Sequence, residues 1–287
     1  MKPKDYRYNS KRSLIIKEAP AQADEMARKM KDELIMRTEE NIERMSELQQ
    51  RLYASGKEGL IVLLQGMDAS GKDSLIRRLF SGLNPQGVRV YSFKAPAGEE
   101  LRRDYLWRVT KCLPERGMIS IFNRSHYEDA VTVGVEKLYE KFNMPERCLG
   151  DEIIDKRLEQ IRNFEQYLFE NGIRVVKLFL NISRDEQKKR LLERLDQPRK
   201  NWKFSPDDLA SRARWDDYMA AYEYAINRTA TGHCPWYVLP ADNKWLCRYL
   251  ASEAILDALK NIDPQYPEPD PSAISLIDEY RKALEEA

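Results

Sequence analysis

Cysteine and histidine are scarce in this chain of 287 residues, which contains four cysteines and two histidines. The cysteines stand far apart and form no C-x-x-C pair; they are Cys112, Cys148, Cys234 and Cys247. This spacing predicts isolated, reduced thiols and argues against a zinc site or a disulfide framework. Because reduced thiols are typical of the cytosol, we expect a cytoplasmic protein.

Long apolar runs and an excess of one charge are also missing. No apolar run approaches the roughly 20 residues of a transmembrane helix, and the opening residues lack the apolar core of a signal peptide. The net charge is only +1, whereas dedicated nucleic-acid-binding proteins are usually strongly basic. We therefore expect neither a membrane nor a nucleic acid among the partners of this protein.

Short apolar stretches alternate with amphipathic ones, and no internal repeat is apparent. The runs that predict strands lie at residues 60–64, 88–93, 118–122, 173–180 and 235–240. Helical spacing predicts helices at residues 21–54, 74–80, 99–112, 151–171, from Ser183 onward, 206–228 and 243–261. Such alternation is typical of an α/β fold, here with a five-stranded parallel sheet between two layers of helices.

The two ends of the chain differ from its middle. Residues 1–55 predict a charged, irregular arm followed by the long helix, and residues 266–287 predict a proline-rich tail with a short helix. Residues 56–265 remain as the main domain. The apolar stripe of the long helix can cover its own domain or pair with the same helix of another subunit, and the sequence leaves both open.

A phosphate-binding loop is predicted between the first strand and the helix after it. Residues 66–72 match the pattern G-x-x-x-x-G-K, in which backbone N–H groups, a helix N-terminus and a lysine surround phosphate oxygens. The alternative is a glycine-rich turn that only connects the two elements. The predicted phosphate-binding residues of this segment are Gly66, Ala69, Ser70, Gly71, Lys72 and Asp73.

Two acidic residues make this loop unusual. A carboxylate at Asp68 would repel phosphate strongly unless a divalent cation lay between them, so Asp68 is a candidate metal ligand. As an alternative, Asp68 is a turn residue that caps the helix. Asp73 stands where Ser or Thr usually binds magnesium; it either assists the metal or favours the helix start through its charge.

The segment 123–129, Asn-Arg-Ser-His-Tyr-Glu-Asp, follows the third predicted strand. Arg124 can fork onto phosphate oxygens, or it can form a salt bridge with Glu128 or Asp129. His126 can donate to phosphate or serve as a structural hydrogen-bonding residue. Glu128 and Asp129 are candidates for a metal contact or for orienting a substrate.

Two further segments complete the predicted site. Lys94 and Pro96 follow the second strand, close in sequence to Arg103, and the carboxyl ends of parallel strands converge on one crevice. The basic stretch 194–214 lies between helices and predicts a lid that closes over phosphates, the alternative being a solvated loop. The lid and the helix before it contribute the candidate phosphate-binding residues Arg184, Arg199, Lys200 and Lys203.

Three motifs together resemble the second family of polyphosphate kinases, over about residues 35–265 and in order. They are residues 66–73, residues 123–129, and Trp202-Lys203-Phe204-Ser205-Pro206-Asp207-Asp208-Leu209 followed by Trp215-Asp216-Asp217-Tyr218. The resemblance implies a thymidylate-kinase-like P-loop fold with an N-terminal helical extension and a lid. It also implies phosphoryl transfer between inorganic polyphosphate and nucleotides with Mg²⁺, or Mn²⁺ in its place.

Individual roles follow from the same resemblance. Asp68 would bind magnesium, and Lys72 and Arg124 would hold the transferring phosphates. Many members have Asp where this chain has Asn123, so Glu128 or Asp129 is expected to supply that charge. The sequence after Ser125 is similar to the subgroup that accepts nucleoside mono- and diphosphates. The residues expected to bind the nucleotide are Lys94, Pro96, Arg103 and Glu128, the expected metal ligands are Asp68 and Asp129, and we expect a homo-oligomer.

Two rival functions remain open from the sequence. An ATP-dependent nucleoside or nucleotide kinase would use a similar loop, but Asp68 and Asp73 are unusual for one. A nucleotide-sensing or nucleic-acid-binding module would usually carry a strong basic charge, which +1 is not.

Overall fold

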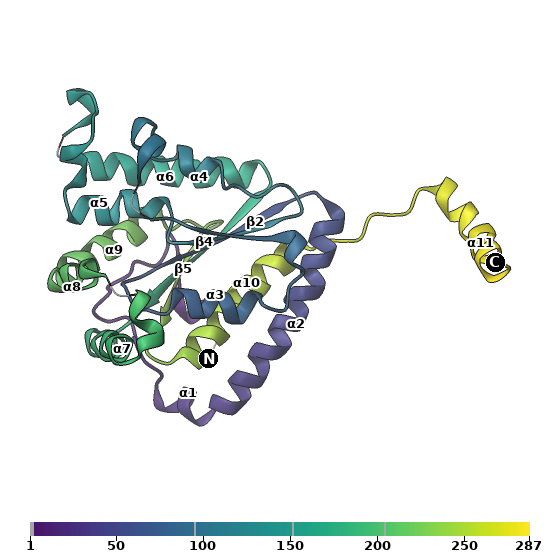
Figure 1. Ribbon diagram of the computed structural model, residues 1–287, viewed down its shortest axis with the longest axis horizontal. Helices are drawn as coiled ribbons and strands as arrows, with labels where there is room; N and C mark the ends of the chain where they lie inside the picture. Colours follow the sequence, from purple (N-terminus) through teal and green to yellow (C-terminus); the bar gives the residue numbers. More distant parts are fainter. Residues whose placement is uncertain (1–2, 95, 151, 204) are drawn as a thin grey trace.

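The computed structural model describes residues 3–94, 96–150, 152–203 and 205–287, with the side chains of Lys203 and Ser275 outside the described part. A six-stranded sheet runs through the molecule in the order β1-β6-β5-β2-β4-β3 (Figure 1). Its strands are β1 (Arg7–Tyr8), β2 (Gly59–Gln65), β3 (Val88–Ser92), β4 (Ile119–Asn123), β5 (Ile173–Asn181) and β6 (Trp236–Pro240).

All five predicted strands are present and pair in parallel, with β2 buried along its whole length between β4 and β5. The prediction of a purely parallel, five-stranded sheet was nevertheless wrong. The two-residue strand β1 pairs antiparallel with β6, Arg7 lying opposite Tyr237. Two residues are too few to show an apolar alternation, so this strand could not be read from the sequence.

Helices cover both faces of the sheet (Figure 1). The helices α2, α3 and α10 lie on one side, and α5, α6 and α9 lie on the other. The α-helices are α1 (Glu25–Lys29), α2 (Lys31–Ser55), α3 (Lys72–Phe80), α4 (Trp107–Thr110), α5 (Val131–Val135), α6 (Ile153–Glu170), α7 (Arg184–Asp196), α8 (Pro206–Ala213), α9 (Trp215–Thr229), α10 (Lys244–Ile262) and α11 (Pro271–Glu285). Short 3₁₀ helices span Pro3–Tyr6, Pro85–Gly87, Gly98–Arg102, His126–Asp129, Leu138–Lys141, Glu146–Cys148 and Pro198–Lys203.

Three predicted helices are divided in the structure. The helix expected over 21–54 breaks at Met30, where φ is −95° and ψ is 9°, and the helix expected over 206–228 breaks at Arg214, where φ is −100° and ψ is 28°. The segment 99–112 holds only a 3₁₀ helix and the four-residue α4, because Arg103 is extended. No Gly or Pro marks the breaks at Met30 and Arg214, so the sequence carried no local signal that these two helices would be interrupted.

The long helix α2 packs on its own molecule, against α10. It buries Leu34, Ile42, Met45 and Leu52, and the side chain of Asn41 donates to Ser252 Oγ at 3.1 Å. Of the two predictions for its apolar stripe, the structure has the one in which the helix covers its own domain.

The C-terminal helix α11 stands clear of the rest of the molecule at the end of an extended, proline-containing segment (Figure 1). Five of its large apolar side chains are exposed to solvent: Ile274, Leu276, Ile277, Tyr280 and Leu284. Across the described residues, none of the helices combines the length and the apolar character needed to cross a membrane.

Candidate active site

The loop between β2 and α3 has the strained backbone of a phosphate-binding loop. Gly66, Ala69 and Gly71 all have positive φ angles, of 143°, 61° and 111°. A Cβ atom at Gly66 would lie 2.8 Å from the carbonyl oxygen of Leu180, so only glycine fits there without a shift of β5. The chain can therefore make the narrow turn that points successive N–H groups inward.

Lys72 is buried at the start of α3. Its Nζ donates to the carbonyl oxygens of Gly66 at 2.6 Å and Met67 at 3.2 Å, so the ammonium group lies inside the loop. Burial, with the positive charge of Arg124, lowers the pKa of Lys72 to about 8. A bound phosphate would raise that pKa again, because an anion favours the charged amine.

Arg124 brings the second motif to the loop. Its φ is 63°, a conformation that non-glycine residues adopt rarely, and its backbone N–H donates to Leu64 O at 3.1 Å. The guanidinium group forms ion pairs with Asp68 and, at 3.1 Å, with Glu128. The carboxylate of Glu128, together with that of Asp68, raises the pKa of Arg124 above its usual value.

Glu128 is held in place from several sides. Thr132 Oγ1 donates to its Oε2 at 2.9 Å, and the Gln65 amide, in the orientation that satisfies both of its ends, donates to its Oε1 at 2.9 Å. Beside it, Asn123 Nδ2 donates to Asp73 Oδ1 at 2.8 Å and joins the second motif to the start of α3. The two motifs thus form one network at the carboxyl ends of β2 and β4.

Asp129 takes a different position from its neighbour. Its carboxylate accepts from Arg108 NH2 at 3.1 Å and is almost fully buried, and burial raises its pKa. Its backbone carbonyl accepts from Arg157 NH1 at 2.6 Å. Asp129 therefore pairs with Arg108, whereas Glu128 pairs with Arg124, and it lines the neighbouring cavity.

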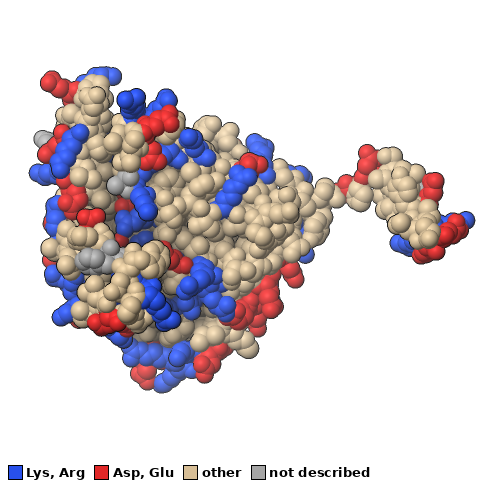
Figure 2. Space-filling view, viewed as in Figure 1, with Lys and Arg blue, Asp and Glu red and all other residues tan. Residues whose placement is uncertain are grey.

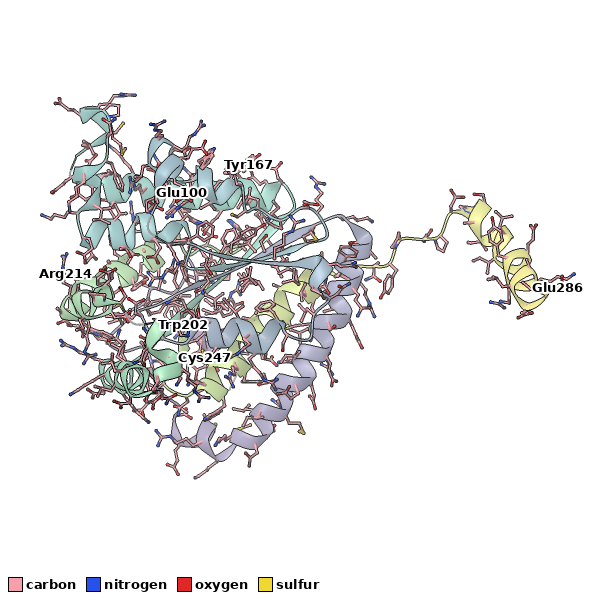
Figure 3. The ribbon with its side chains drawn as sticks, viewed as in Figure 1. Glu100, Tyr167, Trp202, Arg214, Cys247 and Glu286 are labelled. Carbon is pink, nitrogen blue, oxygen red and sulfur yellow. The ribbon has the colours of Figure 1, made fainter. Side chains whose placement is uncertain are left out.

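A cavity of about 890 Å³ lies beside this network, between residues 96–108 and 142–160. The expected nucleotide residues Pro96 and Arg103 line it, and Lys94 O accepts from Arg108 NH1 at 2.6 Å at its edge. Figure 3 labels Glu100, which also lines this cavity. The far wall includes Tyr105 and Phe142, and Phe142 belongs to a segment for which the sequence gave no functional prediction.

Two side chains of α7 donate hydrogen bonds to backbone carbonyl groups of the phosphate loop. Gln187 Nε2 donates to Asp68 O at 3.0 Å, and Arg190 NH1 donates to Ser70 O at 2.8 Å and to Ala69 O at 3.2 Å. Neither residue was predicted as part of the site, because a long-range contact from a helix to a backbone carbonyl leaves no local pattern in the sequence.

The predicted lid comprises the end of α7, the 3₁₀ helix Pro198–Lys203 and α8. Arg194 NH1 pairs with Asp208 at 2.6 Å, and burial, together with the charge of Asp68, raises the pKa of Asp208. This segment lies close to the phosphate loop, because Arg212 NH1 of α8 donates to Gln187 Oε1 at 2.9 Å and Gln187 in turn donates to Asp68 O. Trp202, which is labelled in Figure 3, is 78% exposed, and Arg184 and Arg199 are also exposed. The predictions for the Lys203 side chain and Phe204 lie outside the described residues, as do Ala95 and Asp151.

His126 is buried away from the loop. It lies between Tyr127 and Glu165, with Nε2 3.6 Å from Glu165 Oε1. Glu165 also accepts from Lys177 Nζ at 2.6 Å, deep in the core. Among the described residues, neither ring nitrogen of His126 has a hydrogen-bond partner, so the predicted role as a structural hydrogen-bonding residue is not borne out. Its role as a phosphate donor stays a prediction.

The donor set beside the loop suits a hard divalent cation. Magnesium takes one or two carboxylates and completes its shell with water and substrate phosphates, so no closed cage of side chains is needed. Asp68 presents a partly exposed carboxylate within the loop itself. The described residues contain no group of three or more His, Cys, Asp and Glu that would hold a metal alone.

Comparisons with known proteins find similar proteins along most of the chain. The family model described as "Polyphosphate kinase 2 (PPK2)" matches residues 28–267. The chain is 45% identical over 252 residues to an ADP-polyphosphate phosphotransferase of Rhodopseudomonas palustris, covering 87% of this chain and 86% of the other. It is 46% identical over 234 residues to an AMP/ADP-polyphosphate phosphotransferase of Meiothermus ruber, covering 82% and 84%. The crystal structure of polyphosphate kinase 2 from Arthrobacter aurescens superposes with a TM-score of 0.89 at 36% identity, over 100% of this chain and 98% of that one.

Proposed function

The chain belongs to the polyphosphate kinase 2 family, and on this premise we propose that it transfers phosphoryl groups reversibly between inorganic polyphosphate and AMP or ADP. GMP and GDP are further candidate acceptors. One observation carries the proposal: the ion pair between Asp68, inside the phosphate loop, and Arg124 of the second motif. It brings an acid and a phosphate-binding cation together beside Lys72.

The reaction needs the terminal phosphoryl group and the attacking nucleotide oxygen in line. Lys72 and the inward N–H groups of the loop would hold the terminal phosphates of the donor. Arg124 would bind the oxygens of the transferring group, where charge spreads in the transition state. The negative leaving group is the shortened polyphosphate chain, and no covalent protein intermediate is required.

Asp68 would hold Mg²⁺, or Mn²⁺ in its place, between its carboxylate and the phosphate oxygens. The bound cation would neutralise charge on the phosphates and orient them. The ion pair between Asp68 and Arg124 fits this arrangement. Both of its members have a phosphate-directed role, and each holds the other in position before substrate binds.

The nucleotide would occupy the cavity of about 890 Å³ lined by Pro96 and Arg103. Its aromatic wall can contact a base, and Arg103 can meet the nucleotide phosphate. Glu128 and Asp129 lie between this cavity and the phosphate loop, so an acceptor phosphate entering from the cavity would approach Arg124.

The segment 194–214 would close over the phosphates and exclude water, which protects the donor from hydrolysis. Its cations, the exposed Arg199 and the partly buried Lys200 among them, would meet the polyanion. We also propose a cytoplasmic homo-oligomer, in which the exposed apolar side chains of α11 are candidates for subunit contact.

The direct test is incubation with polyphosphate, magnesium and each of AMP, ADP, GMP and GDP in the absence of ATP. New nucleoside di- or triphosphate supports the proposal. An ATP-dependent kinase, the rival within the same fold, would form products only when ATP replaces polyphosphate as the donor.

A further inference from the structure

A cluster of buried polar side chains joins one residue of the second motif to the protein core. Lys177 of β5 lies at its centre, and its side chain has no exposed surface. Its Nζ donates to Glu165 Oε2 of α6 at 2.6 Å, to Thr229 O at 2.9 Å and to the Tyr127 hydroxyl at 3.2 Å. The Tyr127 hydroxyl donates in turn to Glu165 Oε1 at 2.8 Å. Lys177, Glu165 and Tyr127 thus close a ring of three hydrogen bonds, which we call the core anchor.

An ion pair inside the core is costly to bury. Figure 2 shows Lys and Arg side chains spread over the visible face of the molecule, where water solvates them, whereas Lys177 and Glu165 are both buried. Apolar side chains of similar volume would often stabilise a core as well or better. Apolar contacts, however, do not hold a partner by hydrogen bonds of defined length and direction. The ion pair therefore points to a role in fixing the Tyr127 hydroxyl, in addition to any contribution to stability.

The ring of Tyr127 is held in the core as well. It packs edge-on against Trp236 of β6, with the ring centroids 4.8 Å apart and the ring planes at 73°. Only 1% of Tyr127 is exposed to solvent. Because close-packed interiors transmit small shifts, a change at the hydroxyl would be felt by the backbone of Tyr127.

That backbone belongs to the short 3₁₀ helix His126–Asp129, which carries Glu128. Tyr127 N donates to Ser125 Oγ at 3.2 Å, and Glu128 N donates to Ser125 O at 3.0 Å. Glu128, directly after Tyr127, pairs with Arg124 at 3.1 Å. Arg124 has a φ of 63°, a conformation that persists only where the surrounding structure enforces it. A shift of Tyr127 would therefore move Glu128 and, through the ion pair, Arg124.

We propose that Tyr127 is a positioning residue, whose hydroxyl, fixed by the core anchor, sets the places of Glu128 and Arg124 at the transferring phosphoryl group. This proposal rests on the proposed function. The alternative is a core anchor that stabilises the fold and has no effect on turnover. Arg124 would act mainly on charge that develops in the transition state, so its displacement lowers kcat more than it raises KM.

The test variant is Tyr127→Phe, which removes one hydroxyl and keeps both the ring and the pair of Lys177 with Glu165. Lys177→Met is less suitable, because it would leave Glu165 buried without its cation and destabilise the whole fold. The matched control is Tyr249→Phe, which takes a hydroxyl from a buried tyrosine of α10, on the other side of the sheet. Glu128→Gln is made alone and combined with Tyr127→Phe.

Each variant is assayed for kcat and both KM values with ADP, polyphosphate and magnesium, well below its unfolding midpoint. We expect Tyr127→Phe to lower kcat by about tenfold or more with little change in KM, because a small misplacement at the reacting centre is costly to the rate. Tyr249→Phe should leave kcat unchanged even where it lowers the unfolding midpoint. In the double variant, the loss in kcat should be smaller than the product of the two single losses, because both changes act on Arg124.

A normal kcat in Tyr127→Phe, an equal loss of kcat in Tyr249→Phe, or single losses that multiply in the double variant would overturn the positioning role. The core anchor would then serve stability alone. Failure of the proposed function has a different signature, in which the wild type forms products with ATP and not with polyphosphate as the donor. The same comparison of kcat values with ATP would then test the positioning role.

Discussion

Arg124 forms ion pairs with two acidic residues, and these ion pairs fix the position of its guanidinium group in the site. Asp68 reaches it from the phosphate loop and Glu128 from the following turn, so its guanidinium group is fixed between two motifs that are far apart in sequence. The sequence left open whether Arg124 binds phosphate or forms a salt bridge. The structure contains the salt bridge, and the phosphate role remains a prediction.

The side-chain partner of Asp129 could not be predicted from the sequence. Adjacent acids suggested a shared metal site, but the two side chains of Glu128 and Asp129 point to different partners. Arg108 pairs with Asp129 across a sequence separation of 21 residues. Such a pairing depends on how α4 packs, which no local pattern reveals.

Lys72 gives the first prediction. Its ammonium group is lost as the pH rises through its pKa of about 8, so kcat/KM for polyphosphate should fall above that pH. Lys72→Arg should move this fall to higher pH, because arginine keeps its charge. Lys72→Ala should lower kcat by roughly 10²-fold or more and remove the pH dependence, while circular dichroism stays native. Near-normal turnover in folded Lys72→Ala would remove Lys72 from the mechanism.

Asp68 gives the second prediction. Asp68→Asn keeps the shape of the side chain but removes the charge that attracts a divalent cation. The magnesium concentration for half-maximal activity should rise several-fold, as measured by magnesium titration at saturating substrates. Asp73→Asn serves as a comparison from the same loop. An unchanged magnesium dependence in Asp68→Asn would return Asp68 to the role of a turn residue.

Glu128 gives the third prediction. AMP is one phosphoryl unit shorter than ADP, yet its attacking oxygen must reach the same donor. Glu128, between the cavity and Arg124, is the residue that we expect to bridge this gap, directly or through a cation. Glu128→Gln should therefore lower kcat/KM for AMP more than for ADP. Parallel loss of both activities would refute this role and leave the kinase proposal intact.

At the scale of elements, apolar runs located the strands well and located helix ends poorly. All five predicted strands lie within two residues of their observed ends. The buried strand β2 is apolar along almost its whole length, whereas the partly exposed edge strand β3 alternates. The helices break at Met30 and Arg214, where tertiary packing decides the backbone angles. The phosphate loop was predictable because its chemistry requires glycines at fixed positions.

The lid gives the fourth prediction. Arg199 and Lys200 lie in the 3₁₀ helix of the lid, and we expect them to contact polyphosphate rather than the nucleotide. Replacing both with Gln should raise KM for polyphosphate by about three- to tenfold and change KM for ADP little. The effect should shrink as salt is added, since exposed charges are screened. Equal rises in both KM values would indicate a defect of closure instead.

At the scale of the whole molecule, the body of the protein and α11 are separate. The described side chains of α11 are exposed along its length, and the body has its own core around the sheet. The sequence indicated this division through the prolines that begin at Pro264. It did not indicate how much apolar surface the tail would expose.

The tail gives the fifth prediction. A chain that ends at residue 265 should keep the thermal unfolding midpoint and the activity of the full chain at low protein concentration, because α11 buries nothing on the body. Sedimentation velocity should show a smaller assembly if α11 joins subunits. A lower unfolding midpoint that does not depend on protein concentration would mean that the tail stabilises its own body, contrary to the division proposed above.

The central claim is that polyphosphate itself donates the phosphoryl group. The most direct measurement follows ³²P from terminally labelled polyphosphate into nucleotides, with AMP and magnesium present and no nucleoside triphosphate added. We expect labelled ADP first and then ATP, with Lys72→Ala as a control whose turnover is lower by roughly 10²-fold or more. Labelled inorganic phosphate without labelled nucleotide, or nucleotide products that form only after ATP is added, would contradict it.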